Sequence, residues 1–239
     1  MEHDDVLQAS DAHELARGFE LQQFGRRRPF EIDDPLVEPA WPGLRTIAAV
    51  SGSGATLWWD GEAFDQRPEV TSALARMTGA LVDGGAIFEG YVTKQITPEG
   101  IGAGIGHAEV PSASRVISRL FIGGGRDRAR EFEERQKAER EAQIFGEDDV
   151  VNLVLVDLLW LDGQWLLDVP LLERKRVLES IVPAEQLVRP GLYVREPVGS
   201  MIGSWRAQGF RSMMFKAANS RYRPGETADD WTRADLPQR

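Results

Sequence analysis

The sequence predicts an α+β fold. Short apolar runs of strand length are dispersed among stretches with the apolar spacing of amphipathic helices. Glycine-containing tight-turn signals follow several of the strand-like runs, which indicates hairpins rather than the regular strand–helix alternation of a doubly wound parallel sheet. The chain has 239 residues, enough for one large domain that buries a core without disulfides.

Composition argues against several kinds of site. The chain has no cysteines, which excludes disulfides, thiolate metal centres and cysteine nucleophiles, and its three histidines argue against a multi-histidine metal site. No apolar run approaches the ~20 residues of a membrane-spanning helix, and the acidic N-terminus does not look like a signal peptide. We therefore expect a cytoplasmic protein without a membrane partner. Because the net charge is −10, any contact with nucleic acid must depend on a local basic patch.

The N-terminal half is expected to begin with a helical extension over residues 1–32. Asp11 and Glu14 have capping-box spacing, and apolar residues follow at helical intervals. From residue 46 the pattern changes to strands and one helix that starts at a proline. The expected elements are strands at 46–50, 55–59 and 86–93, a turn at Asp60-Gly61 and a helix over 68–81.

The middle of the chain reads as an insertion, at about residues 97–148. It is glycine-rich at first and then almost wholly charged over 126–143, with Glu and Arg or Lys at helix-stabilising spacing. We expect a mobile loop followed by a solvated helix. The remaining expected elements are a strong strand at 152–160, helices at 170–182 and 199–207, and strands at 192–198 and 213–216.

Two C-terminal segments carry a family resemblance. Residues 151–182 combine a strand containing Asp-Leu-Leu, an Asp-Gly turn and a helix that opens Pro-Leu-Leu-Glu-Arg; residues 209–231 combine a strand ending in lysine with Ser-Arg-Tyr-Arg-Pro-Gly and a tryptophan. In this order they resemble the adenylation domain of ATP-dependent DNA ligases. The resemblance covers about residues 33–239. It implies two antiparallel sheets flanked by helices around a nucleotide cleft, the ATP-grasp-like nucleotidyltransferase fold of DNA ligases and mRNA capping enzymes.

The resemblance also implies a reaction with ATP and magnesium as cofactors. A lysine amine attacks the α-phosphate of ATP, and the AMP then moves to a DNA 5′-phosphate. The first family motif is Lys-x-Asp-Gly with an arginine two residues later. Aligned on Ser51-Gly52-Ser53-Gly54, Ser51 takes the position of the lysine, Ser53 that of the aspartate and Thr56 that of the arginine. A serine hydroxyl would form a phosphate ester in place of a labile phosphoramidate, so this alignment predicts lost catalysis.

Other motif positions are altered as well. The third motif, Asp-Gly-Glu in a strand, aligns either with Phe88-Glu89-Gly90 or with Asp83-Gly84-Gly85. The first register is favoured because Tyr91-Val92 continues the strand, and it leaves Glu89 as a weak metal candidate; a solvent-facing strand residue is the alternative. Where the family has an aromatic residue that stacks on adenine, this chain has Val156, which offers no π-face.

The C-terminal motifs keep their positive charge and lose their carboxylate. In the fourth motif the metal-binding glutamate is replaced by Arg211, whereas Lys216 is retained, either as a phosphate contact or as a solvent-facing lysine. In the last motif Arg233 keeps the first positive charge and Asp235 reverses the second. The chain ends four residues later, so we expect no oligonucleotide-binding barrel. If a phosphate still binds, Lys216, Arg233 and Arg211 should converge on it without magnesium.

Three functional hypotheses follow. The first is a degenerate ligase-like domain with a non-catalytic role in DNA repair or recombination, which binds nucleotide or DNA or contacts a protein of a repair complex. The second is an active ligase whose nucleophile is another lysine; Lys94 is the nearest candidate, although its context does not resemble Lys-x-Asp-Gly. The third is a structural or protein-interaction domain that binds no nucleotide.

Overall fold

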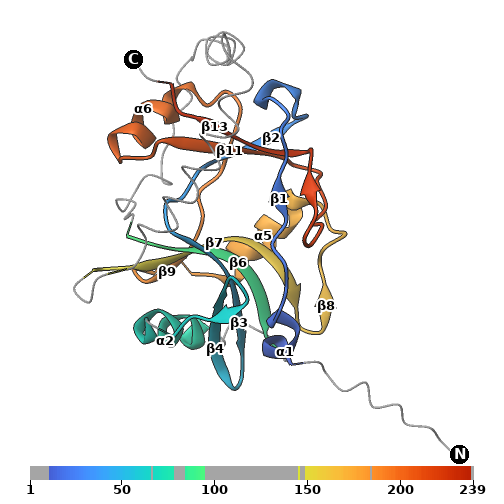
Figure 1. Cartoon of the computed structure of the whole chain (residues 1–239), viewed down its shortest axis with the longest axis vertical. Helices are drawn as coiled ribbons and strands as arrows, with labels where there is room; N and C mark the ends of the chain where they lie inside the picture. Colours follow the sequence, from blue (N-terminus) through green and yellow to red (C-terminus); the bar gives the residue numbers. More distant parts are fainter. Residues whose placement is uncertain are drawn as a thin grey trace, which may run out of the picture.

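The computed structural model describes residues 11–65, 67–77, 84–94, 145, 149–183 and 185–237. Two mainly antiparallel sheets face each other, and helices pack against them (Figure 1). The predicted α+β class with two antiparallel sheets is therefore confirmed. The predicted glycine-rich loop and most of the charged insertion at 97–148 lie outside the described residues, as do residues 1–10 of the N-terminal extension.

The large sheet forms the lower layer in Figure 1. Its central pairs, β3–β6 and β6–β7, are antiparallel, and β9 adds a short parallel pair to β7. Its strands are β3 (Leu44–Ser51), β4 (Gly54–Trp59), β5 (Glu62–Ala63), β6 (Ala86–Thr93), β7 (Asn152–Leu161), β8 (Gln164–Trp165) and β9 (Val188–Pro190).

The small sheet lies above it, in the order β10-β2-β11-β13, and is antiparallel throughout. Its strands are β2 (Pro35–Pro39), β10 (Val194–Arg195), β11 (Ser212–Ala217) and β13 (Trp231–Asp235). A separate parallel pair joins β1 (Gln23–Phe24) to β12 (Thr227–Ala228) and links the N-terminal segment to the end of the chain.

The helices bury apolar faces against the sheets. They are α1 (Ala12–Ala16), α2 (Pro68–Arg76), α5 (Leu171–Ile181) and α6 (Gly199–Ala207), with a 3₁₀ turn at Pro29–Glu31. In α2 the proline at the start fixes a helical φ, and Val70 and Leu74 are buried. In α5, Leu171 and Leu178 pack inward as predicted, and Ile181 is partly buried against the same core. Within the described residues, no helix is long and apolar enough to cross a membrane.

Most predicted elements occur, with several differences, among them strand β13 and the short strands β1, β5, β8, β9 and β12, which were not predicted. The N-terminal helix ends at Ala16, and the following residues are extended and pack into a core cluster with Tyr222 and Trp231; the domain boundary at residue 32 stays a prediction. The strand expected at 192–198 is reduced to Val194–Arg195. Strand β2 was not predicted, because prolines at both of its ends mask a strand pattern.

Candidate functional site

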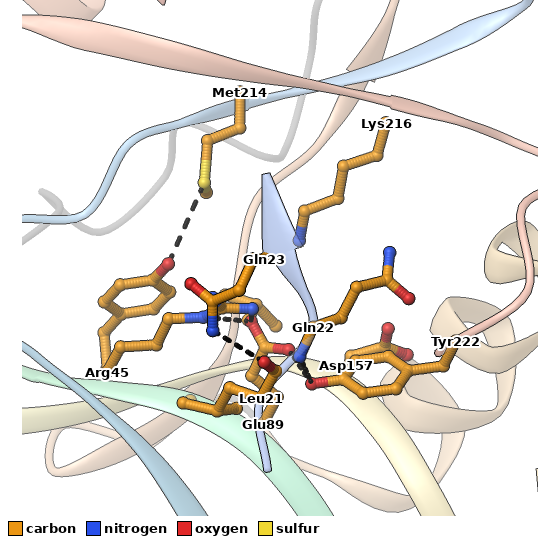
Figure 2. Close-up of polar contacts among 12 residues, drawn as sticks. Leu21, Gln22, Gln23, Arg45, Glu89, Asp157, Met214, Lys216 and Tyr222 are labelled. Carbon is orange, nitrogen blue, oxygen red and sulfur yellow. Dashed lines mark hydrogen bonds and ion pairs between the residues drawn. The ribbon is translucent and has the colours of Figure 1, made fainter. Parts of the chain in front are cut away.

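Charged side chains from both sheets meet in the space between them. On the large sheet, Glu89 on β6 pairs in register with Asp157 on β7, so both side chains leave the same face. On the small sheet, Glu38 is paired with Met214, two residues before Lys216, so Glu38 and Lys216 also share a face. We call the assembled group the cleft cluster, part of which Figure 2 shows. Its members are Glu38, Arg45, Glu89, Asp157, Arg174, Lys175, Lys216 and Tyr222.

Glu89 uses both carboxylate oxygens within the protein. Arg45 donates from Nε to Oε1 at 2.9 Å, its Nη2 lies 2.9 Å from the same oxygen as an ion pair, and the Tyr222 hydroxyl donates to Oε2 at 2.8 Å. Burial opposes ionisation of Glu89, but the positive charges of Arg45 and Lys216 lower its pKa below the ordinary value of 4.5. Burial and the neighbouring Glu89 charge raise the pKa of Tyr222 well above 10.0, so this hydroxyl stays a donor. The predicted alternative of a solvent-facing Glu89 is wrong, because the residue is fully buried.

Glu38 holds two lysines with one carboxylate. Lys175 Nζ lies 2.7 Å from Oε1, and Lys216 Nζ lies 3.2 Å from Oε2. The ammonium of Lys216 also lies 4.4 Å from the centre of the Trp231 ring, a cation–π contact. Burial by itself would lower the pKa of Lys216, but the charge of Glu38 raises it above 10.5, so the side chain is an ammonium ion. Lys216 is fully buried, and the alternative of a solvent-facing lysine is therefore wrong.

The Asp157 carboxylate is held by helix α5. Arg174 donates from Nε to Oδ1 at 2.8 Å and from Nη2 to Oδ2 at 2.7 Å, a two-point ion pair with no exposed side-chain surface. Next to it, the carbonyl oxygen of Val156 accepts from Lys175 Nζ at 2.8 Å. The Val156 side chain is fully buried in a core cluster that joins residues of both sheets and α6, so it does not lie at an open base-binding surface.

A cavity of about 620 Å³ lies beside the cleft cluster. One wall is the loop from Ala40 to Arg45, and the others include Trp58, Tyr91 and Arg233. Gly43 in this loop has φ +134°, and a Cβ there would overlap the carbonyl oxygen of Val92. Only glycine lets the loop pass this close to β6.

Ser51 is not brought to the cleft cluster. It ends β3 at the hairpin, six residues after Arg45, which is roughly 20 Å along a strand at ~3.3 Å per residue. Its hydroxyl lies 3.2 Å from His13 Nε2 and 2.7 Å from the Ser53 hydroxyl, and His13 Nδ1 lies 3.1 Å from the Thr56 hydroxyl. Through these contacts with His13, Ser51 and Thr56 help to hold helix α1 against the hairpin.

The three cations expected to bind phosphate separate into two groups. Arg233 is paired with Met214 and donates from Nε to the Ser212 hydroxyl at 2.9 Å, which places it on the same face as Lys216. Arg211 precedes β11 and is exposed. Because side chains alternate along a strand, its position corresponds to the face opposite to that of Lys216. The structure thus brings Lys216 and Arg233 to one face and leaves Arg211 outside.

The side chains present do not fit the magnesium ion that the family resemblance implies. Both carboxylate oxygens of Glu89 are occupied by Arg45 and Tyr222. The next side chain on the same face of the strand is Tyr91, which offers no carboxylate to a metal ion. Among the described residues, no group of three carboxylate or imidazole side chains is arranged to hold a metal.

Of the cleft cluster, the sequence offered Glu89 and Lys216 as site candidates; the other six members were missed: Glu38, Arg45, Asp157, Arg174, Lys175 and Tyr222. One signal was available for Arg45. Gly43 and Arg45 have the spacing of the glycine and arginine in the first family motif, whereas the alignment on Ser51 retained only Gly54. The contacts that the missed cluster members make with Glu89, Lys216 and Asp157 join residues far apart in the chain, and a single sequence does not reveal such contacts.

Comparisons with known proteins agree with the fold. A family model described as "ATP dependent DNA ligase domain" matches residues 124–234. A probable DNA ligase of Pseudarthrobacter chlorophenolicus is 37% identical over 93 residues, which are 36% of this chain and 18% of that protein. The multifunctional non-homologous end joining protein LigD of Mycobacterium bovis is 31% identical over 93 residues, 39% of this chain and 12% of that protein.

Among solved structures, the ligase domain of M. tuberculosis LigD matches with a TM-score of 0.61 and 19% identity, over 90% of this chain and 58% of that one. At this identity the match shows the fold. The matched region spans less than a fifth of the length of the two curated relatives. The resemblance to ATP-dependent DNA ligase adenylation domains is confirmed in both sequence and fold.

Proposed function

We propose that this chain, an ATP-dependent DNA ligase-like adenylation domain, does not form lysyl-AMP and acts in DNA repair or recombination as a non-catalytic component. The observation that carries the proposal is that the lysines are held in ion pairs. Within the described residues there are three, and each is ion-paired with a carboxylate: Lys94 with Asp149, and Lys175 and Lys216 with Glu38. A lysine nucleophile must be a neutral amine with access to ATP, and the buried ammonium of Lys216 is neither neutral nor accessible.

We further propose that the position of the family nucleophile is Ala40 and not Ser51. Counting back from Gly43 and Arg45 places Ala40 at the lysine and Pro42 at the aspartate of Lys-x-Asp-Gly. The Ala40–Arg45 loop lines the cavity beside the cleft cluster, and Ala40 N donates to the Ser212 carbonyl oxygen of the small sheet at 2.9 Å. This register is supported by two retained residues and by its position. It replaces a nucleophilic side chain with a methyl group.

The rest of the chemistry is replaced by internal contacts. Glu89 binds Arg45 and Tyr222, while Tyr91 donates to the sulfur of Met214 at 3.9 Å. These contacts support a domain whose cleft is stabilised by its own side chains. What the chain contributes to repair is then binding, and the similarity to LigD, a non-homologous end joining protein by name, supports that setting.

The alternative of an active ligase depends on Lys94. This residue follows the end of β6, five residues after Glu89, which is roughly 16 Å along a strand at ~3.3 Å per residue. Its ammonium is paired with Asp149 and lies 5.8 Å from the centre of the Phe145 ring. A separation of this size from the cleft cluster argues against a role in phosphoryl transfer.

The test is a nick-sealing assay with ATP and magnesium, run beside an electrophoretic shift assay on the same nicked duplex. We expect no sealed product at any protein concentration, together with a shift of the duplex that added salt weakens. Sealing would restore the active-ligase hypothesis. A duplex that stays unshifted at low salt would favour the third hypothesis, a protein-interaction domain.

A further inference from the structure

The loop between β1 and β2 exposes a run of basic residues. The sequence has two runs of three consecutive basic residues, Arg26-Arg27-Arg28 and Arg174-Lys175-Arg176. In the second run, Arg174 and Lys175 are buried in the cleft cluster, whereas all three arginines of the first run are exposed. In a chain with a net charge of −10, this loop is a local basic patch of the kind that contact with nucleic acid requires.

The backbone of this loop is held against the small sheet. Before the arginines, Gly25 N donates to the Trp231 carbonyl oxygen at 2.8 Å. Within the run, the Arg27 carbonyl oxygen accepts from the Thr232 hydroxyl at 2.6 Å. The 3₁₀ turn that follows buries Pro29. The loop is therefore fixed in position and leaves its charged side chains exposed, which lowers the ordering cost of binding a ligand.

The arginines of the loop are only weakly engaged by carboxylates. Within the described residues, the Arg26 side chain makes no ion pair or hydrogen bond. Arg27 Nε lies 3.9 Å from a carboxylate oxygen of Asp229, and Arg28 Nε lies 3.8 Å from one of Glu31. All four of these paired side chains are largely exposed to solvent. Exposed pairs contribute little, so phosphate groups can replace these carboxylates at small cost.

An exposed aromatic ring lies beside the arginines. Phe30 is 53% exposed, and the guanidinium of Arg28 lies 5.3 Å from the centre of its ring. Arginine binds phosphate through charge-assisted hydrogen bonds, and an exposed aromatic ring stacks on an unpaired base. The two chemistries together fit single-stranded DNA, because the bases of a duplex are already stacked on one another.

From this arrangement we infer that residues 26–30 form a contact site for single-stranded DNA, in which Arg26, Arg27 and Arg28 bind phosphates and Phe30 stacks on a base. The inference rests on the proposed function and adds to it a surface and a form of DNA. The site precedes residue 33, where the resemblance to ligases begins, and shares no residue with the cleft cluster. Binding there requires neither a nucleotide nor magnesium.

Fluorescence anisotropy with a labelled thymidine oligonucleotide of about 12 nucleotides, a length within the range of single-stranded sites, measures this binding. Phe30→Ala should weaken it about tenfold, because a stacked base is lost. Arg26→Ala, Arg27→Ala and Arg28→Ala combined should weaken it further. The slope of log affinity against log salt should then fall by about 2, because each phosphate contact to a single strand contributes about 0.7. Urea unfolding of each variant checks that it is folded.

Two matched variants and a second ligand test whether the effect is local. Arg76→Ala removes an exposed arginine of α2, which packs against the large sheet (Figure 1), and Trp165→Ala removes another exposed aromatic ring, on β8. Both variants should bind the oligonucleotide like the wild type. An abasic oligonucleotide of the same length offers phosphates without bases. Phe30→Ala should leave binding of this ligand unchanged, whereas the combined arginine variant should weaken it.

Three results would overturn the inference. They are no measurable binding of the thymidine oligonucleotide at low salt, binding that survives the combined arginine substitution, and an effect of Trp165→Ala in place of Phe30→Ala. A loss at the arginines without any effect of Phe30→Ala would show attraction by charge alone and overturn the assignment to single strands. Each of these results leaves the absence of lysyl-AMP untouched. Conversely, an AMP adduct in the same preparation would contradict the proposed function and leave the DNA contact in place, so the two fail separately.

Discussion

The ammonium nitrogen of Lys216 lies 3.2 Å from a carboxylate oxygen of Glu38, and both side chains are buried. The same carboxylate holds Lys175 at 2.7 Å from its other oxygen. A buried charge is tolerated only when it is paired, so two lysines from different elements depend on one residue of β2. The lysine that the family resemblance assigns to phosphate is thus part of the internal structure of this chain.

The shared carboxylate predicts an asymmetry between two substitutions. Glu38→Gln leaves two buried cations without their carboxylate partner and should lower the free energy of unfolding by about 3–5 kcal/mol. Lys216→Met leaves Glu38 paired with Lys175 and supplies apolar volume, so its cost should be below about 1.5 kcal/mol. Urea unfolding of both variants measures the difference. Equal costs would show that Glu38 does not carry both lysines.

Glu89 predicts a loss of stability in acid. Its pKa is lowered in the folded protein, so its ion pair stabilises the fold above pH 4.5 and this contribution is lost as the pH falls through and below 4.5. Glu89→Gln cannot make the ion pair at any pH. The variant should be less stable than the wild type at pH 7, and the difference should shrink below pH 4.5. Urea midpoints from neutral to acid pH measure it; a constant difference contradicts the prediction.

Helix α5 offers a matched pair of arginines. Arg174 is buried in its two-point contact with Asp157, whereas Arg176 forms an exposed pair with Glu173. Arg174→Ala leaves a buried carboxylate without its partner and should cost about 3–5 kcal/mol. Arg176→Ala, in the same helix, should cost below about 0.5 kcal/mol because exposed pairs contribute little. Thermal and denaturant unfolding should rank them in this order, and similar costs would mean that the Asp157 pair is not structurally required.

We expect the stability of the protein to be sensitive to substitution of the glycine in the loop beside the cavity. Gly43→Ala places a Cβ against the Val92 carbonyl oxygen at a backbone angle that disfavours other residues, and should cost about 2 kcal/mol or more. Gly52→Ala has open space around it and should stay within about 0.5 kcal/mol of the wild type. Equal stability of the two variants in denaturant would contradict the close approach of the loop to β6.

The sequence predicted those elements whose pattern is local. Strands 86–93 and 152–160 are mainly apolar over strand length, each with one carboxylate, and helix 199–207 was found with its bounds. The solvent-facing alternative for Lys216 was wrong because its partner, Glu38, comes from β2, which was itself missed. Burial of a strand lysine depends on what faces the strand, and a single sequence does not give that pairing.

The candidate site shows the same limit. Ser51, chosen for its place in a local Gly-Ser pattern, lies on a hairpin beside His13, while the glycine and arginine with the motif spacing, Gly43 and Arg45, lie before the first predicted strand. Lys216 and Arg233 share a face of the small sheet, whereas their convergence with Arg211 on a phosphate stays a prediction. Arg211 differs because alternation along β11 turns it away from Lys216.

Intact mass spectrometry after incubation with ATP and magnesium tests the central claim most directly. The proposed Ala40 register, together with the ion pairs of the three described lysines, predicts a single species with the mass of the unmodified chain. A protein that gains the mass of one AMP, in a form that peptide mapping assigns to a lysine, would contradict the account and show that adenylation is retained.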